Sequence, residues 1–481
     1  MTRDYVQIYL NGKSHDIRGN EAVMNLSDWL RYQKRLTGTK VVCAEGDCGA
    51  CTVLKGDPRD CDEQGRMHLR PLNSCIAPVA LFDGCAIVTV EALAVGKELH
   101  PVQKAMQSCH GSQCGYCTPG FVMAIAGMHE QVSAKDCKMQ RVKNNLTGNL
   151  CRCTGYQQII DAAMSVKRNE EQLLRQRFDD ESAKTLLIAS RSSSFAVGDE
   201  NWQLVSPVTR AEALDLIQQD PKIRVIAGST DLGVQRNKGR LEQKKFMTLS
   251  RIPDFYDLSE KGGRIFVGAA VNLRRLEDLL SQRLPRFADF MHIFASPQIK
   301  ENATIVGNLA NGSPVGDTLP GLLVLDSQVH LASTDGDRIV PIERFYLGYK
   351  QMDIKPGELI TGMSLAIPDL DYCRFYKISQ RRDLDISAVN AAVRLKVAGG
   401  KVSTFKVAYG GVGPYPLRLP KTESIAVGQT VDSKLVETLA MSVRSEVSPI
   451  SDVRGGQAYR LKLTENIMRR FFDDYSIGKE Q

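Results

Sequence analysis

The chain lacks most features of membrane, secreted and nucleic-acid-binding proteins. Its N-terminus has no apolar signal core, and residues 1–10 are expected to form a strand of the fold. Its most apolar region, residues 75–95, is interrupted by Asp83, Gly84 and Glu91, which argues against a membrane span. The net charge is +7, but no dense Lys/Arg run with interleaved aromatics occurs. We therefore expect a cytoplasmic protein that binds neither membranes nor nucleic acid.

Common hydrolytic motifs are missing as well. The seven histidines form no H-x3-H or HExxH pair, and no Ser/His/Asp nucleophile arrangement stands out. We therefore expect no covalent catalysis by this chain.

Length and cysteine content are what the sequence does offer. At 481 residues the chain is too long for one ordinary domain. Its composition, 43% hydrophobic and 24% charged, is typical of a folded protein with ample core. In the reducing compartment expected without a secretion signal, its 13 cysteines are better explained by metal binding than by disulfides.

The first cysteine group has the C-x4-C-x2-C…C spacing of a plant-type [2Fe–2S] ferredoxin. It consists of Cys43, Cys48, Cys51 and Cys75. Gly46 and Gly49 allow the loop to adopt positive φ and to point N–H groups at the sulfurs. Structural zinc usually uses paired C-x2-C knuckles, so this spacing favours iron–sulfur over zinc or four merely buried cysteines.

The second cysteine group consists of Cys114, Cys117, Cys151 and Cys153. Each pair precedes a helix-like run, for which Thr118 and Thr154 are the expected N-caps. Helix N-termini favour thiolate, so two of them offer four sulfurs to one charged cofactor. Spacing alone leaves zinc open here, and the neighbouring first group favours a second iron–sulfur cluster.

The N-terminal third predicts a β-grasp-like domain followed by helices. Residues 5–17 alternate in polarity around Asn11-Gly12, which is typical of a hairpin. A helix-like run follows at residues 25–33 and a strand at 86–90, and residues 92–165 are mostly helical in pattern. Residues 166–194 have linker composition, and we expect a solvated path between domains with at most transient helix.

The remaining chain alternates strands, helices and glycine turns, which indicates two α+β lobes. The expected strands are 224–227, 265–268, 324–331, 388–397 and 406–409, and the expected helices are 436–443 and 459–475.

Two segments of this region have the composition of a phosphate- or flavin-binding loop. Residues 228–233 follow a strand, so their N–H groups are placed to bind a pyrophosphate. Residues 302–317 combine small residues with Asn and Asp. The first segment matches neither the dinucleotide motif G-x-G-x-x-G nor a P-loop, so an ordinary strand-exit turn stays open for it. For the second segment, the alternative is an ordinary Gly/Asn loop in a β-rich domain.

Three runs, residues 99–103, 112–120 and 148–156, resemble the xanthine dehydrogenase family of molybdenum hydroxylases. The resemblance implies a multidomain α+β chain with a vanillyl-alcohol-oxidase-like flavin fold. The implied parts are a ferredoxin-like [2Fe–2S] domain (1–91), a helical [2Fe–2S] domain (92–165), a linker (166–196), an FAD-binding domain (197–372) and a C-terminal flavoprotein lobe (373–481).

The resemblance also implies roles for particular residues. Gln113 would approach a molybdopterin on a partner chain, and both cysteine groups would hold [2Fe–2S] clusters. Val306 replaces a glycine common in the family. Residues 380–385 resemble a loop near the flavin that distinguishes NAD-using from oxygen-using members. The FAD-binding set would be Val225, Ile226, Ala227, Gly228, Ser229, Thr230, Asp231, Leu232, Phe294, Thr304, Gly307, Asn308, Asp317 and Lys377.

The implied function is electron transfer within a xanthine dehydrogenase. Electrons from the oxidation of hypoxanthine and xanthine to urate on a large molybdopterin subunit would pass through the second cluster, the first cluster and FAD to NAD. The implied assembly is (αβ)2. Within the family, an aldehyde, carbon monoxide or N-heterocycle hydroxylase is the alternative. Outside the enzyme class, the alternative is a zinc-stabilised or redox-sensing binding module without turnover.

Overall fold

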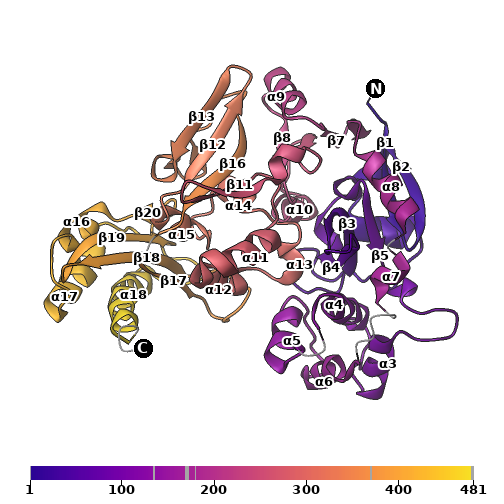
Figure 1. Cartoon of the computed structure of the whole chain (residues 1–481), viewed down its shortest axis with the longest axis horizontal. Coiled ribbons are helices and arrows are strands. Elements are labelled where there is room, and N and C mark those ends of the chain that lie inside the picture. Colours follow the sequence, from indigo (N-terminus) through magenta and orange to yellow (C-terminus); the bar gives the residue numbers. More distant parts are fainter. Residues whose placement is uncertain (1, 134–135, 168–172, 179, 369–370, 478–481) are drawn as a thin grey trace. The chain divides into compact units, whose positions relative to one another are not determined.

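The computed structural model describes residues 2–133, 136–167, 173–178, 180–368 and 371–477, and it divides into two compact units (Figure 1). The first unit comprises Met1–Pro253 and Ser296–Ala303, and the second comprises Asp254–Ala295 and Thr304–Gln481. Each unit therefore contains several of the expected domains. The domain boundaries inferred from the sequence stay predictions.

The N-terminal sheet has the strand order β2-β1-β5-β3-β4. Asn11 and Gly12 adopt positive φ (50° and 86°) between the antiparallel strands β1 and β2, which confirms the predicted hairpin. The helix-like run forms α2 and a π-helical turn, Trp29–Gln33, and Trp29 is fully buried. The strands are β1 (Tyr5–Leu10), β2 (Lys13–Arg18), β3 (Thr52–Cys61), β4 (Met67–Asn73) and β5 (Cys85–Val88), and the helices are α1 (Gly19–Val23) and α2 (Leu26–Asp28).

Four helices follow, as the sequence predicts for residues 92–165. Helix α4 is buried from Gly120 to Glu130. At Gly127 a Cβ would stand only 2.8 Å from Leu54 Cδ2, so α4 lies directly on strand β3. The four helices are α3 (Pro101–Ser108), α4 (Thr118–Gln131), α5 (Met139–Leu146) and α6 (Gln157–Ser165).

The expected solvated linker is wrong for the described part of 166–196. This segment forms α7 (Leu174–Phe178) and α8 (Glu181–Ser190), which bury Leu174, Phe178 and Leu187. Glu130 accepts a hydrogen bond from the backbone N–H of Leu174 at 2.7 Å. The sequence of this segment contains too few apolar residues among its many charged ones to show a helical period. Residues 168–172 and 179 lie outside the described part.

The first unit is completed by a second sheet of order β6-β7-β9-β8. The predicted strand 224–227 is confirmed as β8 (Arg224–Ile226). The other elements are β6 (Phe195–Gly198), β7 (Gln203–Ser206), β9 (Lys245–Thr248), α9 (Arg210–Gln219), α10 (Leu232–Asn237) and α13 (Pro297–Lys300).

The second unit begins with an antiparallel sheet of order β10-β11-β16-β12-β13. The predicted strand 324–331 is wrong in its first half: α15 ends at Val324, and β12 begins only at Gln328. The strands are β10 (Leu258–Lys261), β11 (Arg264–Gly268), β12 (Gln328–Ser333), β13 (Gly336–Pro341), β14 (Tyr346–Gly348), β15 (Gln351–Met352) and β16 (Leu359–Ala366). The helices are α11 (Leu273–Arg283), α12 (Pro285–Phe294), α14 (Ile305–Asn311) and α15 (Leu319–Val324).

The C-terminal part packs helices on a sheet of order β17-β18-β19-β20 (Figure 1). The predicted strands and helices of this region are confirmed, but the strand predicted at 406–409 already begins at Lys401. Their shared core includes Val393, Tyr409, Leu439 and Phe471. The elements are β17 (Tyr372–Ile378), β18 (Val389–Ala398), β19 (Lys401–Gly410), β20 (Leu417–Arg418), α16 (Pro420–Ala426), α17 (Ser433–Val443) and α18 (Gln457–Ile477). Among the described residues, no helix is both long and apolar enough to span a membrane.

Candidate functional site

Each sulfur of the first cysteine group has another sulfur of that group as a neighbour, within the first unit. Cys43 hydrogen-bonds with Cys48 and Cys75, and Cys75 also hydrogen-bonds with Cys51. Cys51 and Cys75 are each only 2% exposed. The loop 43–51 brings three of the sulfurs together, and the 3-10 turn Ser74–Ile76 supplies the fourth.

The backbone of loop 43–51 has the predicted conformation. Ala44, Gly46 and Gly49 have φ of 54°, 75° and 67°, the left-handed region that favours glycine. At Gly46 a Cβ would stand 2.6 Å from Ile76 Cδ1, so a side chain does not fit there. The N–H of Glu45 points at Cys43 Sγ, 3.4 Å away. The loop therefore directs backbone dipoles toward the sulfurs, an arrangement that stabilises negative charge on them.

These thiols divide into hydrogen-bond donors and acceptors. The thiols of Cys48 and Cys75 donate to Cys43, which holds the Cys43 pKa below its usual range. The same donation raises the pKa of Cys48 and, together with donation to Cys51, the pKa of Cys75. A cationic centre bound among them would deprotonate all four, because a coordinating thiol ionises outright.

The second cysteine group forms two sulfur pairs that join its two loops. Cys117 hydrogen-bonds with Cys151, and Cys114 with Cys153. Burial raises the pKa of Cys117 to about 12, and donation to Cys151 adds to this. Burial opposes ionisation of Cys151, yet hydrogen bonds from the Thr154 hydroxyl (3.1 Å) and N–H (3.4 Å) lower its pKa. Cys114 and Cys153 are exposed.

Both donor sets fit [2Fe–2S] clusters, which are held by four cysteine thiolates. Among the described residues, no group of three or more His, Cys, Asp or Glu side chains is arranged to hold a metal ion. The sulfurs of the second group meet in two pairs, and those of the first group follow one another in the order Cys48, Cys43, Cys75, Cys51. Each group thus offers the four cysteines that a two-iron cluster needs.

The threonine caps predicted beside the second group are wrong. Cys117 itself is the N-cap residue of α4, and the Thr118 hydroxyl donates to Ser112 Oγ at 2.8 Å. Helix α6 begins at Gln157, and the Thr154 hydroxyl donates to a sulfur instead of capping the helix. Each threonine hydroxyl therefore bonds to a neighbouring loop side chain and not to the helix backbone. Of the predicted helix starts, only the placement of Cys117 at the start of α4 is confirmed. Gln113 is exposed beside Cys114, and its contact with molybdopterin stays a prediction.

The first predicted flavin segment, residues 225–232, runs from β8 into α10. At Gly228 a Cβ would stand 1.9 Å from the Asn302 carbonyl oxygen, so only glycine fits. Ser229 has φ of 62°, and its hydroxyl donates to Ile76 O at 3.0 Å. These contacts hold the loop tightly, while Thr230 and Asp231 retain exposed surface.

The other predicted FAD residues lie in the second unit. Thr304 caps α14 by accepting from the Gly307 N–H at 2.8 Å. Asn308 Oδ1 accepts from the Thr318 hydroxyl at 2.7 Å. Phe294 is the half-buried last residue of α12.

Asp317 and Lys377 form a buried ion pair. Lys377 Nζ lies 2.5 Å from Asp317 Oδ2, and the lysine side chain is 0% exposed. Ser387 donates to Asp317 Oδ1 at 2.5 Å, and Asn390 Nδ2 donates to the same oxygen at 2.8 Å. Sequence reasoning missed Ser387 and Asn390. An asparagine inside the apolar run 388–397 was the available signal, because buried polar groups need partners.

The loop resembling the acceptor loop of the family is a tethered, ion-paired turn. Asp385 accepts from the Arg381 N–H at 3.1 Å and pairs with Arg454 at 2.9 Å. Leu384 has φ of 59°, and its N–H donates to Ile293 O at 3.2 Å. Burial would raise the Asp385 pKa, but these backbone and charge contacts lower it. The loop therefore has a defined conformation within the second unit.

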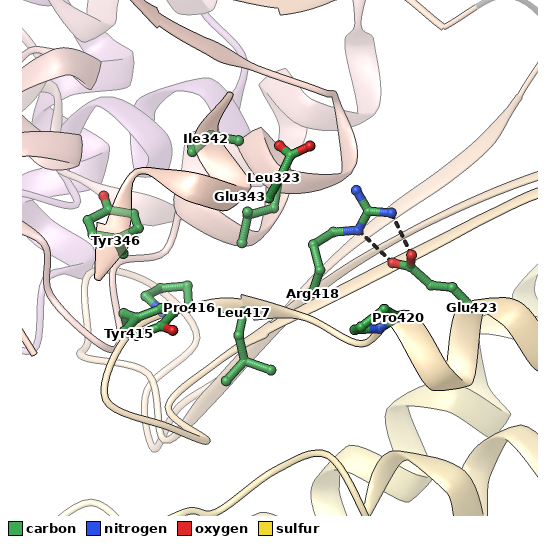
Figure 2. A pocket seen from close by; sticks show the side chains of 10 residues that line it. All are labelled: Leu323, Ile342, Glu343, Tyr346, Tyr415, Pro416, Leu417, Arg418, Pro420 and Glu423. Atoms are coloured by element: carbon green, nitrogen blue, oxygen red, sulfur yellow. Dashed lines mark hydrogen bonds and ion pairs between the residues drawn. The ribbon is translucent and has the colours of Figure 1, made fainter. Parts of the chain in front are cut away.

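A separate cavity of about 410 Å³ lies in the second unit (Figure 2). Tyr346 and Tyr415 stack at one end, with ring centroids 6.0 Å apart. Arg418 points at Glu423 and forms two hydrogen bonds of 2.5 Å with its carboxylate, as Figure 2 shows. The residues lining this cavity include none of the predicted FAD residues.

Four family models match successive parts of the chain. They are the 2Fe-2S iron-sulfur cluster binding domain (8–80), the [2Fe-2S] binding domain (89–164), the FAD binding domain in molybdopterin dehydrogenase (200–369) and the CO dehydrogenase flavoprotein C-terminal domain (374–475). The predicted α+β fold and the order of its cofactor domains are confirmed.

Individual relatives agree with these matches. Xanthine dehydrogenase of Drosophila pseudoobscura pseudoobscura is 31% identical over 96% of this chain and 38% of the relative. Aldehyde oxidase 4 of Cavia porcellus is 27% identical over 98% of this chain and 39% of the relative. A structure of CO dehydrogenase from Oligotropha carboxidovorans aligns with a TM-score of 0.52 at 28% identity, over 55% of this chain and 94% of that chain. The chain thus spans 38–39% of the length of these two curated relatives.

The domains and the two cysteine groups define an iron–sulfur and flavin electron-transfer module. The chain belongs to the xanthine dehydrogenase and CO dehydrogenase family of molybdenum hydroxylases.

Proposed function

We propose that this chain is the electron-transfer subunit of a xanthine dehydrogenase, working with a separate large subunit that carries molybdopterin. Oxidation of hypoxanthine or xanthine there would add oxygen from water to the purine and release two electrons and two protons per step. This chain would carry the electrons to FAD and on to NAD. The observation that carries the proposal is the presence of two groups of four cysteines, in which each sulfur hydrogen-bonds with another sulfur of its group. They lie in a chain that continues into flavoprotein domains.

Exposure of the two cysteine groups supports the proposed direction of transfer. Cys114 and Cys153 are exposed, and Tyr116 (49%) and Leu150 (39%) present apolar surface nearby in sequence. Exposed apolar surface of this kind suits a protein partner. The first group is more deeply buried, through Cys51 and Cys75. We therefore propose that the second group faces the partner and the first group passes electrons onward.

The cofactors supply the redox chemistry when bound: each cluster exchanges one electron, and FAD accepts two and gives them up as hydride. The chain orients them and adjusts their environment. Loop 43–51 would stabilise thiolate through its N–H groups, and Thr154 would do so at Cys151. The Asp317–Lys377 pair would present fixed charges to FAD from a water-poor position.

The relatives differ in substrate, and this supports a second candidate. The C-terminal match is to a CO dehydrogenase flavoprotein domain, and aldehyde oxidases align over nearly the whole chain. A carbon monoxide, aldehyde or N-heterocycle hydroxylase is therefore the alternative.

Metal analysis and a substrate screen test the proposal. The purified chain should be brown, with flavin bands and about four irons, two for each cluster. A colourless zinc protein would refute it in favour of a non-catalytic module. Copurification with a molybdopterin subunit, followed by assays with xanthine, aldehydes, carbon monoxide and N-heterocycles and with NAD or oxygen as acceptor, then identifies the reaction. Activity confined to a substrate other than the purines would replace xanthine dehydrogenase by the alternative.

A further inference from the structure

A single buried asparagine connects the loops that carry the two cysteine groups. Asn149, 2% exposed, stands two residues before Cys151. Its Nδ2 donates to Gly49 O at 3.0 Å and to Thr52 Oγ1 at 3.4 Å. Its Oδ1 accepts from Gln298 Nε2 at 2.7 Å. Both amide hydrogens and the amide oxygen are therefore used, which fixes the orientation of the side chain.

Beside Asn149, a backbone hydrogen bond joins the two loops directly. The Leu150 N–H donates to the Cys48 carbonyl oxygen at 3.0 Å. Cys48 belongs to the first cysteine group, and Leu150 adjoins Cys151 of the second. The hydrogen bond between Leu150 and Cys48, together with the covalent bond from Leu150 to Cys151, therefore connects a predicted ligand of one cluster to a predicted ligand of the other. Electron tunnelling is more efficient along such a bonded route than across a gap of the same length.

The loops approach too closely at this point to tolerate side chains. At Gly49, whose φ is 67°, a Cβ would stand 2.2 Å from Gly148 O and 2.5 Å from Asn149 Nδ2. At Gly148 a Cβ would stand 2.1 Å from Gln298 Oε1. The contact thus consists of the two glycines and the buried side-chain amides of Asn149 and Gln298. Asn149 bonds both to the loop of the first cysteine group and to Gln298.

We propose that Asn149 is a positioning residue for electron transfer between the two cluster sites. It holds the Leu150–Cys48 hydrogen bond in place and so sets the electronic coupling between the sites. The inference rests on the proposed function, since it requires a cluster at each cysteine group. A purely structural asparagine would change stability when replaced, and would leave the coupling as it is.

The test compares the full, cofactor-loaded chain with its Asn149→Ala variant. Asn145→Ala is the control, because the Asn145 amide donates to Arg141 O within its own helix, at 2.8 Å. In Asn149→Ala we expect both cluster signals in paramagnetic resonance to persist and the magnetic interaction between them to weaken. In the iron-free chain, the Leu150 amide should exchange with solvent about tenfold faster, the effect of weakening one hydrogen bond. Asn145→Ala should match the unmodified chain in both measurements.

An unchanged magnetic interaction between the clusters in Asn149→Ala overturns the inference, whether or not the exchange of the Leu150 amide changes. If that variant does not fold, Asn149→Asp decides in the same way, because it retains the acceptor for Gln298 and loses the donor to Gly49. Absence of iron from the unmodified chain would refute the proposed function instead, so the two failures are distinguishable.

Discussion

Removal of the Lys377 charge tests the buried network assigned to the flavin site. Lys377→Met keeps the apolar stem and leaves the Asp317 carboxylate, 7% exposed, without its cation. Removing one partner of a buried ion pair typically costs about 3–5 kcal/mol. Ser387 and Asn390 still donate to Asp317, so the lower end, about 3 kcal/mol, applies here. For a unit of this size, that corresponds to a fall in Tm of roughly 6–12 °C.

Differential scanning calorimetry and the flavin content of the purified protein measure this effect. Lys401→Met, which removes an exposed lysine at the start of β19, is the control and should shift Tm by less than about 2 °C. The double variant Lys377→Met/Asp317→Asn should recover part of the lost stability, because the two residues interact directly. A Lys377→Met protein with unchanged Tm and full flavin content would refute the assignment of this pair to a buried flavin site.

Three further changes probe other parts of the molecule. Cys114→Ser should abolish one of the two cluster signals in paramagnetic resonance and keep the other, whereas the control Cys109→Ser should keep both. Two intact signals in Cys114→Ser would contradict the assignment of Cys114 as a cluster ligand. Gly228→Val should deplete bound flavin while iron stays at about four per chain, because even a Cβ at this position would stand 1.9 Å from Asn302 O. Full flavin content in this variant would contradict the assignment of the Gly228 loop to the flavin site. Burial lowers the pKa of His100, which caps α3, to about 4, so the unfolded chain binds more protons between this value and 6.5. The free energy of unfolding should therefore fall by about 2 kcal/mol from pH 7 to pH 5. His100→Asn should remove this part of the pH dependence, which urea unfolding curves measure. An unchanged pH dependence in this variant would contradict the role of His100.

Local signals predicted much of this fold and the conformation of the first cysteine loop. Asn11-Gly12 specifies a hairpin through its own backbone preferences, and the spacing from Cys43 to Cys51 encodes a loop within a few residues. The C-terminal helices were visible because their apolar faces repeat over many residues.

The missed features depend on contacts between distant residues. Asn149 meets Gly49 across 100 residues, and Ser387 meets Asp317 across 70. No local pattern encodes such pairs. Helix α7 in the expected linker likewise forms because Leu174 and Phe178 pack into the hydrophobic core beside α4.

Anaerobic reduction of the purified full-length chain, followed by low-temperature paramagnetic resonance, tests the central claim most directly. We predict two distinct [2Fe–2S] signals that together integrate to about two spins per chain, alongside the optical bands of FAD. One signal, or none with stoichiometric zinc, would contradict the assignment of this chain as a two-cluster electron-transfer module.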